Sequence, residues 1–262
     1  EQGFTKYTTP SSGIIELKEA ICRKFLSENN LNYEIEQVTV NNGAKHSLFL
    51  AVAALVNRGD EVIIPTPYWV TYSEQPRLVG GHPIIVRTQP ENGLKITPEE
   101  FQAAITSRTR MLFLCSPSNP SGSVYTKAEL EDLAQVAVEN NVYVLSDEIY
   151  EKLLYDGIEH YSIASLGEEI KKLTIVVNGV SKAYAMTGWR IGYAGADAER
   201  RELRIQVRVA RADAVVSETT GGSSVGDVAA LELSPEAGSA VWDIRAGMIE
   251  DQAKLRYFQQ LE

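Results

Sequence analysis

Two cations lie close together in a mostly uncharged stretch of the sequence. Lys182 comes shortly after the apolar run LTIVV (173–177), and Arg190 follows eight residues later in SKAYAMTGWRIGY. In open parallel α/β sheets, ligands bind at the carboxyl ends of the strands. A lysine at such an end can form an imine with an aldehyde, and an arginine can hold an anion through two hydrogen bonds. Each could instead form a structural ion pair, Lys182 with Asp147.

Other polar side chains follow two more apolar runs. Asp147 and Tyr150 come after VYVLS (142–146), and Asn119 lies in SPSNPSG, which follows MLFLC (111–115). A carboxylate at the end of a buried strand needs a hydrogen-bonding or charged partner. Asp147 could also be the N-cap of a helix, and SPSNPSG could be a simple loop of turn-forming residues.

A candidate phosphate site follows the run QVTV (37–40). The turn that contains Gly43, Ala44 and Lys45 leads from this run into a predicted helix over 44–57. The first turn of a helix has free N–H groups and the positive end of the helix dipole, which suits a phosphate. Glycine turns into helices are common, so this turn alone does not define a site.

Strand-like and helix-like segments alternate through the first 196 residues. Thr97 and Thr126 each begin a T-x-x-E capping box, and continuous apolar runs indicate strands that are covered on both faces. The alternation predicts an α/β fold with a largely parallel sheet and right-handed crossovers. The predicted strands are 37–40, 61–65, 82–86, 111–115, 142–146 and 173–177, and the predicted helices are 13–29, 44–57, 68–79 and the segments that start near 97 and 126.

The strand ends together would carry an amine, a carboxylate, a phenol, an amide, an arginine and a helix N-terminus. This set matches a phosphate joined to an aromatic ring with a basic nitrogen and a phenolic oxygen. Pyridoxal 5'-phosphate (PLP), bound through a lysine Schiff base, is such a molecule. A dinucleotide matches poorly, because no G-x-G-x-x-G follows the first predicted strand.

Composition narrows the kinds of binding partner and the cellular compartment that we expect for this protein. The chain has 262 residues, a net charge of −10 and two cysteines, Cys22 and Cys115, without a CxxC motif. The acidic balance argues against nucleic-acid and membrane-surface partners. Free thiols and the absence of a long apolar run favour a cytoplasmic protein.

The sequence resembles the class I PLP-dependent aminotransferases of fold type I, most closely the bacterial aspartate aminotransferase subgroup. The similar stretches run in family order from Lys6 to Ala194: KYTTPSSGIIELKEAI, NNGAKHSLFLAVAALVNRGDEVIIPTPYWVTY, SPSNPSGSVYTKAELEDLAQVA, YVLSDEIYEKLLYDG and VVNGVSKAYAMTGWRIGYA. The resemblance implies a PLP-binding large domain over 1–196, with an N-terminal helix and a mostly parallel seven-stranded sheet sandwiched by helices.

The resemblance also implies a role for each matching residue around the cofactor ring. Lys182 would form the Schiff base and shuttle the proton between the substrate Cα and the cofactor C4′. Asp147 would pair with the pyridine nitrogen, and Tyr150 and Asn119 would bond the phenolate oxygen. Trp69, in PYW, would lie over the ring.

For the phosphate and the substrate, the resemblance implies a second set of residues. The Gly43 turn, with the N–H groups of Ala44 and Lys45, would hold the phosphate together with Ser181 and Arg190. Tyr7 would reach the phosphate of a neighbouring subunit, which implies a homodimer with shared active sites. The Lys45 side chain would bind the distal carboxylate of an acidic substrate, beside Trp69 and Asn119, although it could also face solvent.

The chain departs from the family pattern at its two ends, and relative to the family we expect it to be truncated at both. Residues 197–262 are expected to be a divergent helical segment that leads to a small domain, most of which this chain would lack. The expected function is transamination between aspartate or glutamate and 2-oxoglutarate. Two alternatives are another fold type I enzyme, such as a β-lyase, and a truncated PLP-binding scaffold without efficient turnover.

Overall fold

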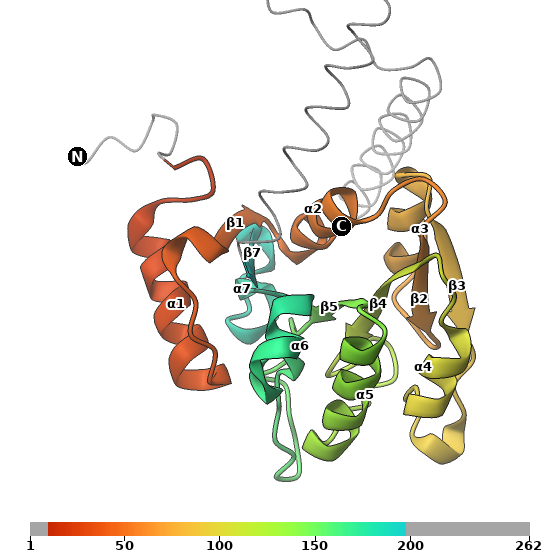
Figure 1. Ribbon diagram of the computed structural model, residues 1–262. Coiled ribbons are helices and arrows are strands. Elements are labelled where there is room, and N and C mark those ends of the chain that lie inside the picture. The colour runs from red at the N-terminus through yellow and green to blue at the C-terminus, as the bar shows by residue number, and fades with distance from the viewer. Residues whose placement is uncertain (1–9, 198–262) are drawn as a thin grey trace, which may run out of the picture. The chain divides into compact units, whose positions relative to one another are not determined.

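A computed structural model describes residues 10–197 (Figure 1). The strands are β1 (Val38–Asn42), β2 (Glu61–Pro65), β3 (His82–Val86), β4 (Thr109–Cys115), β5 (Tyr143–Asp147), β6 (Thr174–Gly179) and β7 (Ile191–Ala196). The α-helices are α1 (Ile15–Asn29), α2 (Ala44–Leu55), α3 (Thr71–Leu78), α4 (Pro98–Ala104), α5 (Lys127–Glu139), α6 (Glu168–Leu173) and α7 (Val180–Ala183). Short 3-10 helices are η1 (Ile35–Gln37), η2 (Pro90–Asn92), η3 (Ile163–Leu166) and η4 (Thr187–Trp189).

All seven strands form one sheet in the order β1-β7-β6-β5-β4-β2-β3. The pairs from β6 through β3 are parallel, whereas β7 is antiparallel to both of its neighbours, β1 and β6. The prediction of a mostly parallel seven-stranded α/β sheet is therefore confirmed. The predicted segment 197–262, apart from Asp197, lies outside the described residues, as does Tyr7.

Strand β7 was not among the strands predicted from apolar runs, because its sequence IGYAGA contains two glycines. Both glycines lie where backbone or ring atoms approach closely. A Cβ on Gly192 would lie 2.2 Å from the Ala44 backbone nitrogen, and a Cβ on Gly195 would lie 2.8 Å from the Tyr33 ring. The first approach brings β7 against the start of α2, and the second brings it against Tyr33, which explains why a strand here has so few large side chains.

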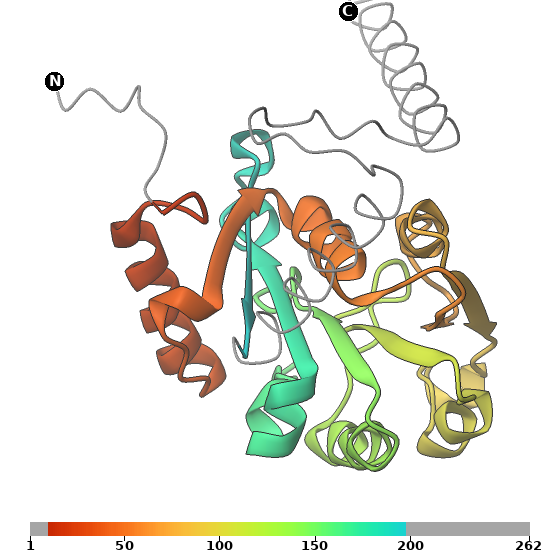
Figure 2. The same cartoon turned by 45° about the horizontal axis from the view of Figure 1, so that its top comes forward.

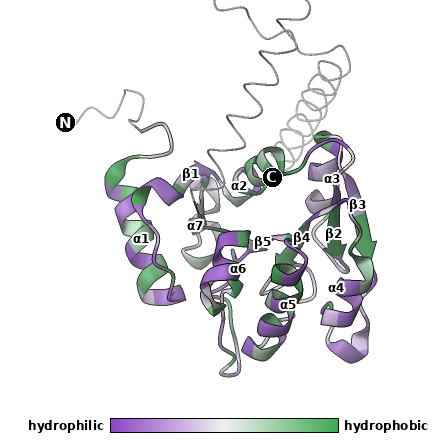
Figure 3. Ribbon diagram, viewed as in Figure 1, coloured by the Kyte–Doolittle hydropathy of each residue, from purple (hydrophilic) through white to green (hydrophobic). Residues whose placement is uncertain are grey.

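Helices cover both faces of the sheet (Figure 2). Helix α2 contacts β1, β5, β6 and β7, with α3 beside it, whereas α5 lies between α4 and α6 on the opposite side. Strand β5 is buried along its whole length, as is the middle of β4. In Figure 3, β2 and β3 are largely hydrophobic and much of α4 is hydrophilic. The alternation of strands and covering helices thus places the carboxyl ends of the parallel strands at one edge of the sheet.

Local sequence signals account for several element boundaries. Thr97 and Thr126 accept hydrogen bonds from the backbone N–H groups of Glu100 and Glu129, so both predicted capping boxes are confirmed. The alternative reading of Asp147 as a helix N-cap is wrong, because turns follow β5 and the next helical element is η3.

The structure also bears on the thiols and on membrane insertion. Cys22 and Cys115 are free, as predicted, and both are partly rather than fully buried. None of the helices within 10–197 combines the length and the hydropathy needed to cross a bilayer.

Candidate active site

A cavity of about 300 Å³ lies where α2, α3, β5 and the β6–β7 connection meet. It brings together every predicted site residue within 10–197 except Gly43, which lies next to it as the N-cap of α2. The lining residues are Ala44, Lys45, Trp69, Tyr72, Asn119, Asp147, Ile149, Tyr150, Ser181, Lys182, Thr187 and Arg190. Residues that are far apart in sequence therefore share one concave site, as the strand-end argument predicted.

One end of this cavity is built for an anion. Gly43 has φ +83°, and a Cβ at this position would lie 2.3 Å from Nη2 of Arg190. The guanidinium therefore lies against the start of α2, where the first N–H groups have no partner inside the helix. Arg190 itself has φ 54°, and its Nη1 donates a hydrogen bond to the Thr187 carbonyl at 3.0 Å. A cation and a helix N-terminus together favour a phosphate or another small anion.

A buried carboxylate lies deeper in the site. Asp147 is 3% exposed, and its Oδ2 accepts a hydrogen bond from the Tyr72 hydroxyl at 2.6 Å. Its Oδ1 accepts one from the Ile149 backbone N–H at 3.2 Å. Burial raises the pKa of Asp147 to about 6, although the Tyr72 and Ile149 hydrogen bonds oppose the rise. Such a carboxylate is suited to a cationic partner, which would lower its pKa again.

The lysine of the site is separate from this carboxylate. Within the described residues, neither Lys182 nor Arg190 forms an ion pair, so the alternative of a Lys182–Asp147 pair is wrong. Lys182 is exposed, and its Nζ lies 5.6 Å from the centroid of the Tyr150 ring. Its amine is therefore available to an incoming molecule.

Tyr150 and Asn119 form a polar pair beside the lysine. Asn119 Nδ2 donates to the Tyr150 hydroxyl at 3.3 Å. Burial raises the pKa of Tyr150, and the negative charge of Asp147 adds to the rise. The phenol therefore stays protonated at neutral pH. Each group can donate a hydrogen bond to an anionic oxygen that enters the cavity.

An aromatic residue and a third cation, Trp69 and Lys45, also line the cavity. Lys45 Nζ lies 4.8 Å from the centroid of the Trp69 ring, and Trp69 packs edge-to-face against Tyr72. Lys45 is exposed and Trp69 is partly buried, so both can contact a ligand that occupies the cavity.

Three lining residues were not predicted from the sequence, namely Tyr72, Ile149 and Thr187. A signal for Tyr72 existed. The segment 68–79 was predicted to be helical, and residues three apart on a helix share a face, which would have placed Tyr72 beside Trp69. Its partner Asp147 lies 75 residues away, so no local pattern links the two.

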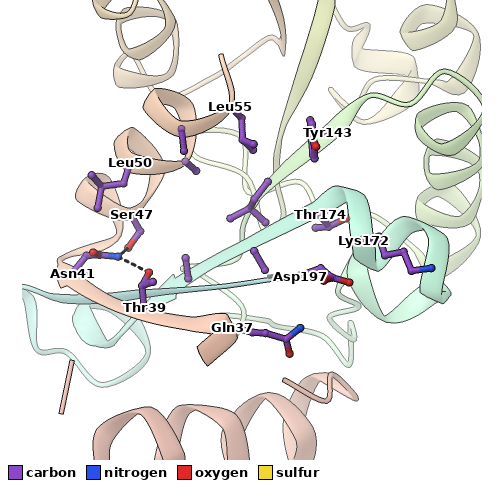
Figure 4. Close-up of a pocket in the computed structure, with 15 residues that line it drawn as sticks. Gln37, Thr39, Asn41, Ser47, Leu50, Leu55, Tyr143, Lys172, Thr174 and Asp197 are labelled. Atoms are coloured by element: carbon purple, nitrogen blue, oxygen red, sulfur yellow. Dashed lines mark hydrogen bonds between the residues drawn. The ribbon is translucent and has the colours of Figure 1, made fainter. Parts of the chain in front are cut away.

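Two other features lie outside this cavity. The first is a smaller cavity of about 80 Å³, which lies between helix α2 and the strands β1, β6 and β7 (Figure 4). Its lining includes Asp197, the last described residue. Its polar part includes Asn41, whose Nδ2 donates to Thr39 and Ser47, and much of the rest is aliphatic. We assign it no role in the chemistry.

The second feature is a cluster of Glu148, Glu151 and His160, whose ligand-type atoms lie within 4.8 Å of one another. Glu148 bonds His160 Nε2 at 3.1 Å and also accepts from two serine hydroxyls. Glu151 pairs with Lys24 and accepts from Asn29. Because both carboxylates have partners, the cluster serves to tie the segment after β5 to α1.

The fold is that of the class I and II aminotransferase family. The profile of the family described as "Aminotransferase class I and II" matches residues 1–255, and the chain belongs to this family. Several of the relatives that it resembles are bacterial aspartate aminotransferases. It is 54% identical over 199 residues to the aspartate aminotransferase of Bacillus sp. (strain YM-2), covering 76% of this chain and 50% of that protein. It is 52% identical over 193 residues to that of Geobacillus stearothermophilus, covering 74% and 49%.

Solved structures agree with these relatives. The aspartate aminotransferase of Rhizobium meliloti superposes with a TM-score of 0.74 at 46% identity, over 84% of this chain and 53% of that one. The Thermus thermophilus aspartate aminotransferase with maleate gives a TM-score of 0.73 at 48% identity, over 79% and 53%. The chain spans about half the length of the curated relatives that it matches.

Proposed function

We propose that this chain forms the PLP-binding large domain, over 1–196, of an aminotransferase that acts on acidic amino acids. The reaction would be aspartate plus 2-oxoglutarate giving oxaloacetate plus glutamate. The observation that carries the proposal is the single cavity shared by Lys182, Asp147 and Arg190, with the start of α2 at its anionic end. Family membership supports the same reaction class.

The residues present fit PLP at both of its ends. The contact between Gly43 and Arg190 makes a cradle for the phosphate, completed by the N–H groups of Ala44 and Lys45 and by Ser181. At the other end, Asp147 is a buried carboxylate that lacks a cation among the described residues. A protonated ring nitrogen would supply that cation.

Other lining residues match the remaining features of the cofactor. Asn119 and Tyr150 would hold the phenolate oxygen, and Trp69 would cover the ring. When bound, PLP supplies an electron sink for the charge that develops at the substrate Cα. Lys182 would anchor the cofactor covalently through Nζ, and the same Nζ, once free, would remove the proton from the substrate Cα.

Substrate choice is assigned to Lys45. Its ammonium group lies over the Trp69 ring at the mouth of the cavity, where it can meet a second carboxylate. The Thermus neighbour was solved with maleate, a dicarboxylate, which supports an acidic substrate here. Relatives named aspartate/prephenate aminotransferase and asparagine–oxo-acid transaminase share 48% and 45% identity, so the substrate needs a direct test.

We also propose a homodimer with shared active sites. Around the cavity, Val70 is 71% exposed, Trp189 69% and Tyr184 54%. These large hydrophobic side chains lie on the segments that carry Trp69, Lys182 and Arg190, and their exposure supports a protein interface beside the cavity. Tyr7, outside the described residues, would reach across this interface to the partner's phosphate.

The test combines PLP binding with product analysis on the full 262-residue chain. PLP should give a visible absorbance band, and borohydride reduction should fix it to the peptide that contains Lys182. Lys182→Ala should abolish both signals, whereas Lys127→Ala, on the exposed face of α5, should change neither. A band that persists in Lys182→Ala would overturn the lysine assignment.

Product analysis then separates the alternatives. Aspartate with 2-oxoglutarate should give glutamate. Pyruvate and ammonia from cysteine derivatives would instead indicate a β-lyase. PLP bound through Lys182 without glutamate production would show a cofactor-binding scaffold.

A further inference from the structure

Tyr72 and Asp147 form a contact that none of the roles above uses. Tyr72 lies in the first turn of α3 and Asp147 at the end of β5, and both are 3% exposed. The phenolic O–H donates to Oδ2 at 2.6 Å, while the backbone N–H of Ile149 donates to Oδ1 at 3.2 Å. Each carboxylate oxygen thus has its own donor, so the plane of the carboxylate is fixed from two sides.

The Tyr72 ring is itself held in place. It stacks on Phe113 of β4, with centroids 4.7 Å apart and planes 22° apart, and it meets Trp69 edge-to-face at 5.7 Å. Because the buried Phe113 stacks on the ring and Trp69 meets it edge-to-face, these contacts restrict movement of the ring relative to the carboxylate. The hydroxyl therefore imposes its position on Asp147.

The contact also affects charge. A hydrogen bond donated to a carboxylate favours its ionised form. Burial is the largest influence that raises the pKa of Asp147, and the Tyr72 hydrogen bond is the largest influence that opposes this rise. Burial, together with the negative charge of Asp147, holds the pKa of Tyr72 well above its usual range, so Tyr72 remains a donor.

Other titratable groups surround the same carboxylate. Cys115 pairs with Asp147 in the β4–β5 register, Glu148 follows it in the chain, and Tyr150 and Lys182 line the same cavity. The charge of Glu148 raises the pKa of Asp147, and burial keeps the Cys115 thiol protonated by raising its pKa to about 12. Among these neighbours, Tyr72 is the side chain that hydrogen-bonds the carboxylate.

We infer that Tyr72 is a positioning residue for Asp147: it aims the carboxylate into the cavity and keeps it ionised to hold a protonated ring nitrogen. The cofactor part of this inference rests on the proposed function. The Tyr72–Asp147 coupling itself does not, because it concerns the protein without a ligand.

The experiment uses Tyr72→Phe, which keeps the ring and removes only the hydroxyl. In the cofactor-free chain, ¹³C NMR should show the Asp147 carboxyl titrating about one pH unit higher in the variant. With ¹⁵N-labelled PLP, the ring nitrogen should lose its proton at lower pH, and PLP should bind about tenfold more weakly. In an Asp147→Asn background, Tyr72→Phe should leave PLP affinity unchanged.

The matched control is Tyr125→Phe. Tyr125 is also buried, and its hydroxyl also makes one hydrogen bond, accepted from the Ile96 N–H at 3.1 Å. This variant should lower stability by a similar amount without moving the Asp147 midpoint. An equal midpoint shift in both variants, or none in Tyr72→Phe, would overturn the inference.

A measurement on the unmodified chain covers the case in which Tyr72→Phe does not fold. The Tyr72 hydroxyl proton should show a low-field NMR signal whose pH midpoint equals that of Asp147. Independent midpoints would refute the coupling. A shifted Asp147 midpoint in a chain that does not bind PLP would uphold the coupling and overturn the proposed function instead.

Discussion

The Gly43 Cα and the Arg190 guanidinium are in direct contact. A Cβ built on Gly43 would lie 2.3 Å from Nη2 of Arg190, although 147 residues separate the two positions (190 − 43). The contact brings a cation to the N-terminus of a 12-residue helix, which is why one end of the cavity suits a phosphate.

Gly43→Ala should therefore disrupt anion binding. The added methyl group would push the guanidinium away and would place alanine at φ +83°. We expect stability to fall by about 1 kcal/mol from the backbone strain and PLP affinity to fall about tenfold or more. Gly59→Ala is a matched control, because Gly59 has φ +86° but no atom within 4 Å of the added Cβ. Equal losses of PLP affinity in the two variants would contradict the proposal that the contact between Gly43 and Arg190 forms the phosphate site.

Arg190→Lys tests the geometry of the anion contact. Lysine keeps the charge and loses the planar pair of donors. PLP should bind about tenfold more weakly, and inorganic phosphate should compete less well for the site. Arg77→Lys, on the exposed surface of α3, should change neither affinity. If Arg190→Lys behaves like Arg77→Lys, point charge alone holds the phosphate.

Lys45→Gln tests the choice of acidic substrates. Removing the ammonium above Trp69 should weaken binding of maleate to the PLP-loaded chain about fivefold to tenfold, and should leave binding of the monocarboxylate propionate nearly unchanged. The visible spectrum of the cofactor reports both affinities. Lys127→Gln supplies the charge-matched control. An equal loss of affinity for maleate and for propionate would mean that Lys45 does not bind the distal carboxylate.

His160 gives a prediction about pH and stability. Burial lowers its pKa, but the hydrogen bond and charge of Glu148 outweigh burial, so the net shift is upward from the ordinary value of 6.5. A raised pKa in the folded state means that protonation stabilises the fold. This stabilisation is complete below the ordinary pKa and is lost as pH rises through the folded-state pKa.

Urea unfolding across this range measures the effect. The difference in unfolding free energy between the unmodified chain and His160→Gln should be largest on the acidic side and should shrink as pH rises. A constant difference for His160→Gln would show that the imidazole is not charged in the fold.

The positions of Asp147 and Lys182 in the site could be predicted because they depend on where strands end. Apolar runs located β5 and β6, and parallel pairing then placed Asp147 and Lys182 at the same edge of the sheet. The capping boxes at Thr97 and Thr126 were predictable because they are local. The sequence pattern could not show which side chains in the site pair with one another. Asp147 could have paired with Lys182 or capped a helix, and the structure shows neither.

Two parts of the structure lay beyond sequence reasoning. Strand β7 lacks an apolar run, because Gly192 and Gly195 make room for neighbouring atoms instead of filling space. The hydroxyl partner of Asp147 is Tyr72, and their contact depends on how α3 packs on β4 and β5. Both features depend on how segments that are distant in sequence pack together, and such packing leaves no periodic pattern in the sequence.

The β6–β7 connection carries two of the three cationic side chains that line the site, with Lys182 in α7 and Arg190 just before β7. A molecule bound to both would bridge the two ends of this segment and add its binding free energy to the cost of opening it. Local unfolding of the connection and release of the ligand would then be one event. The amides of 182–190 would acquire hydrogen-exchange protection that rises with ligand concentration, as would amides that exchange only through global unfolding, because both openings release the ligand.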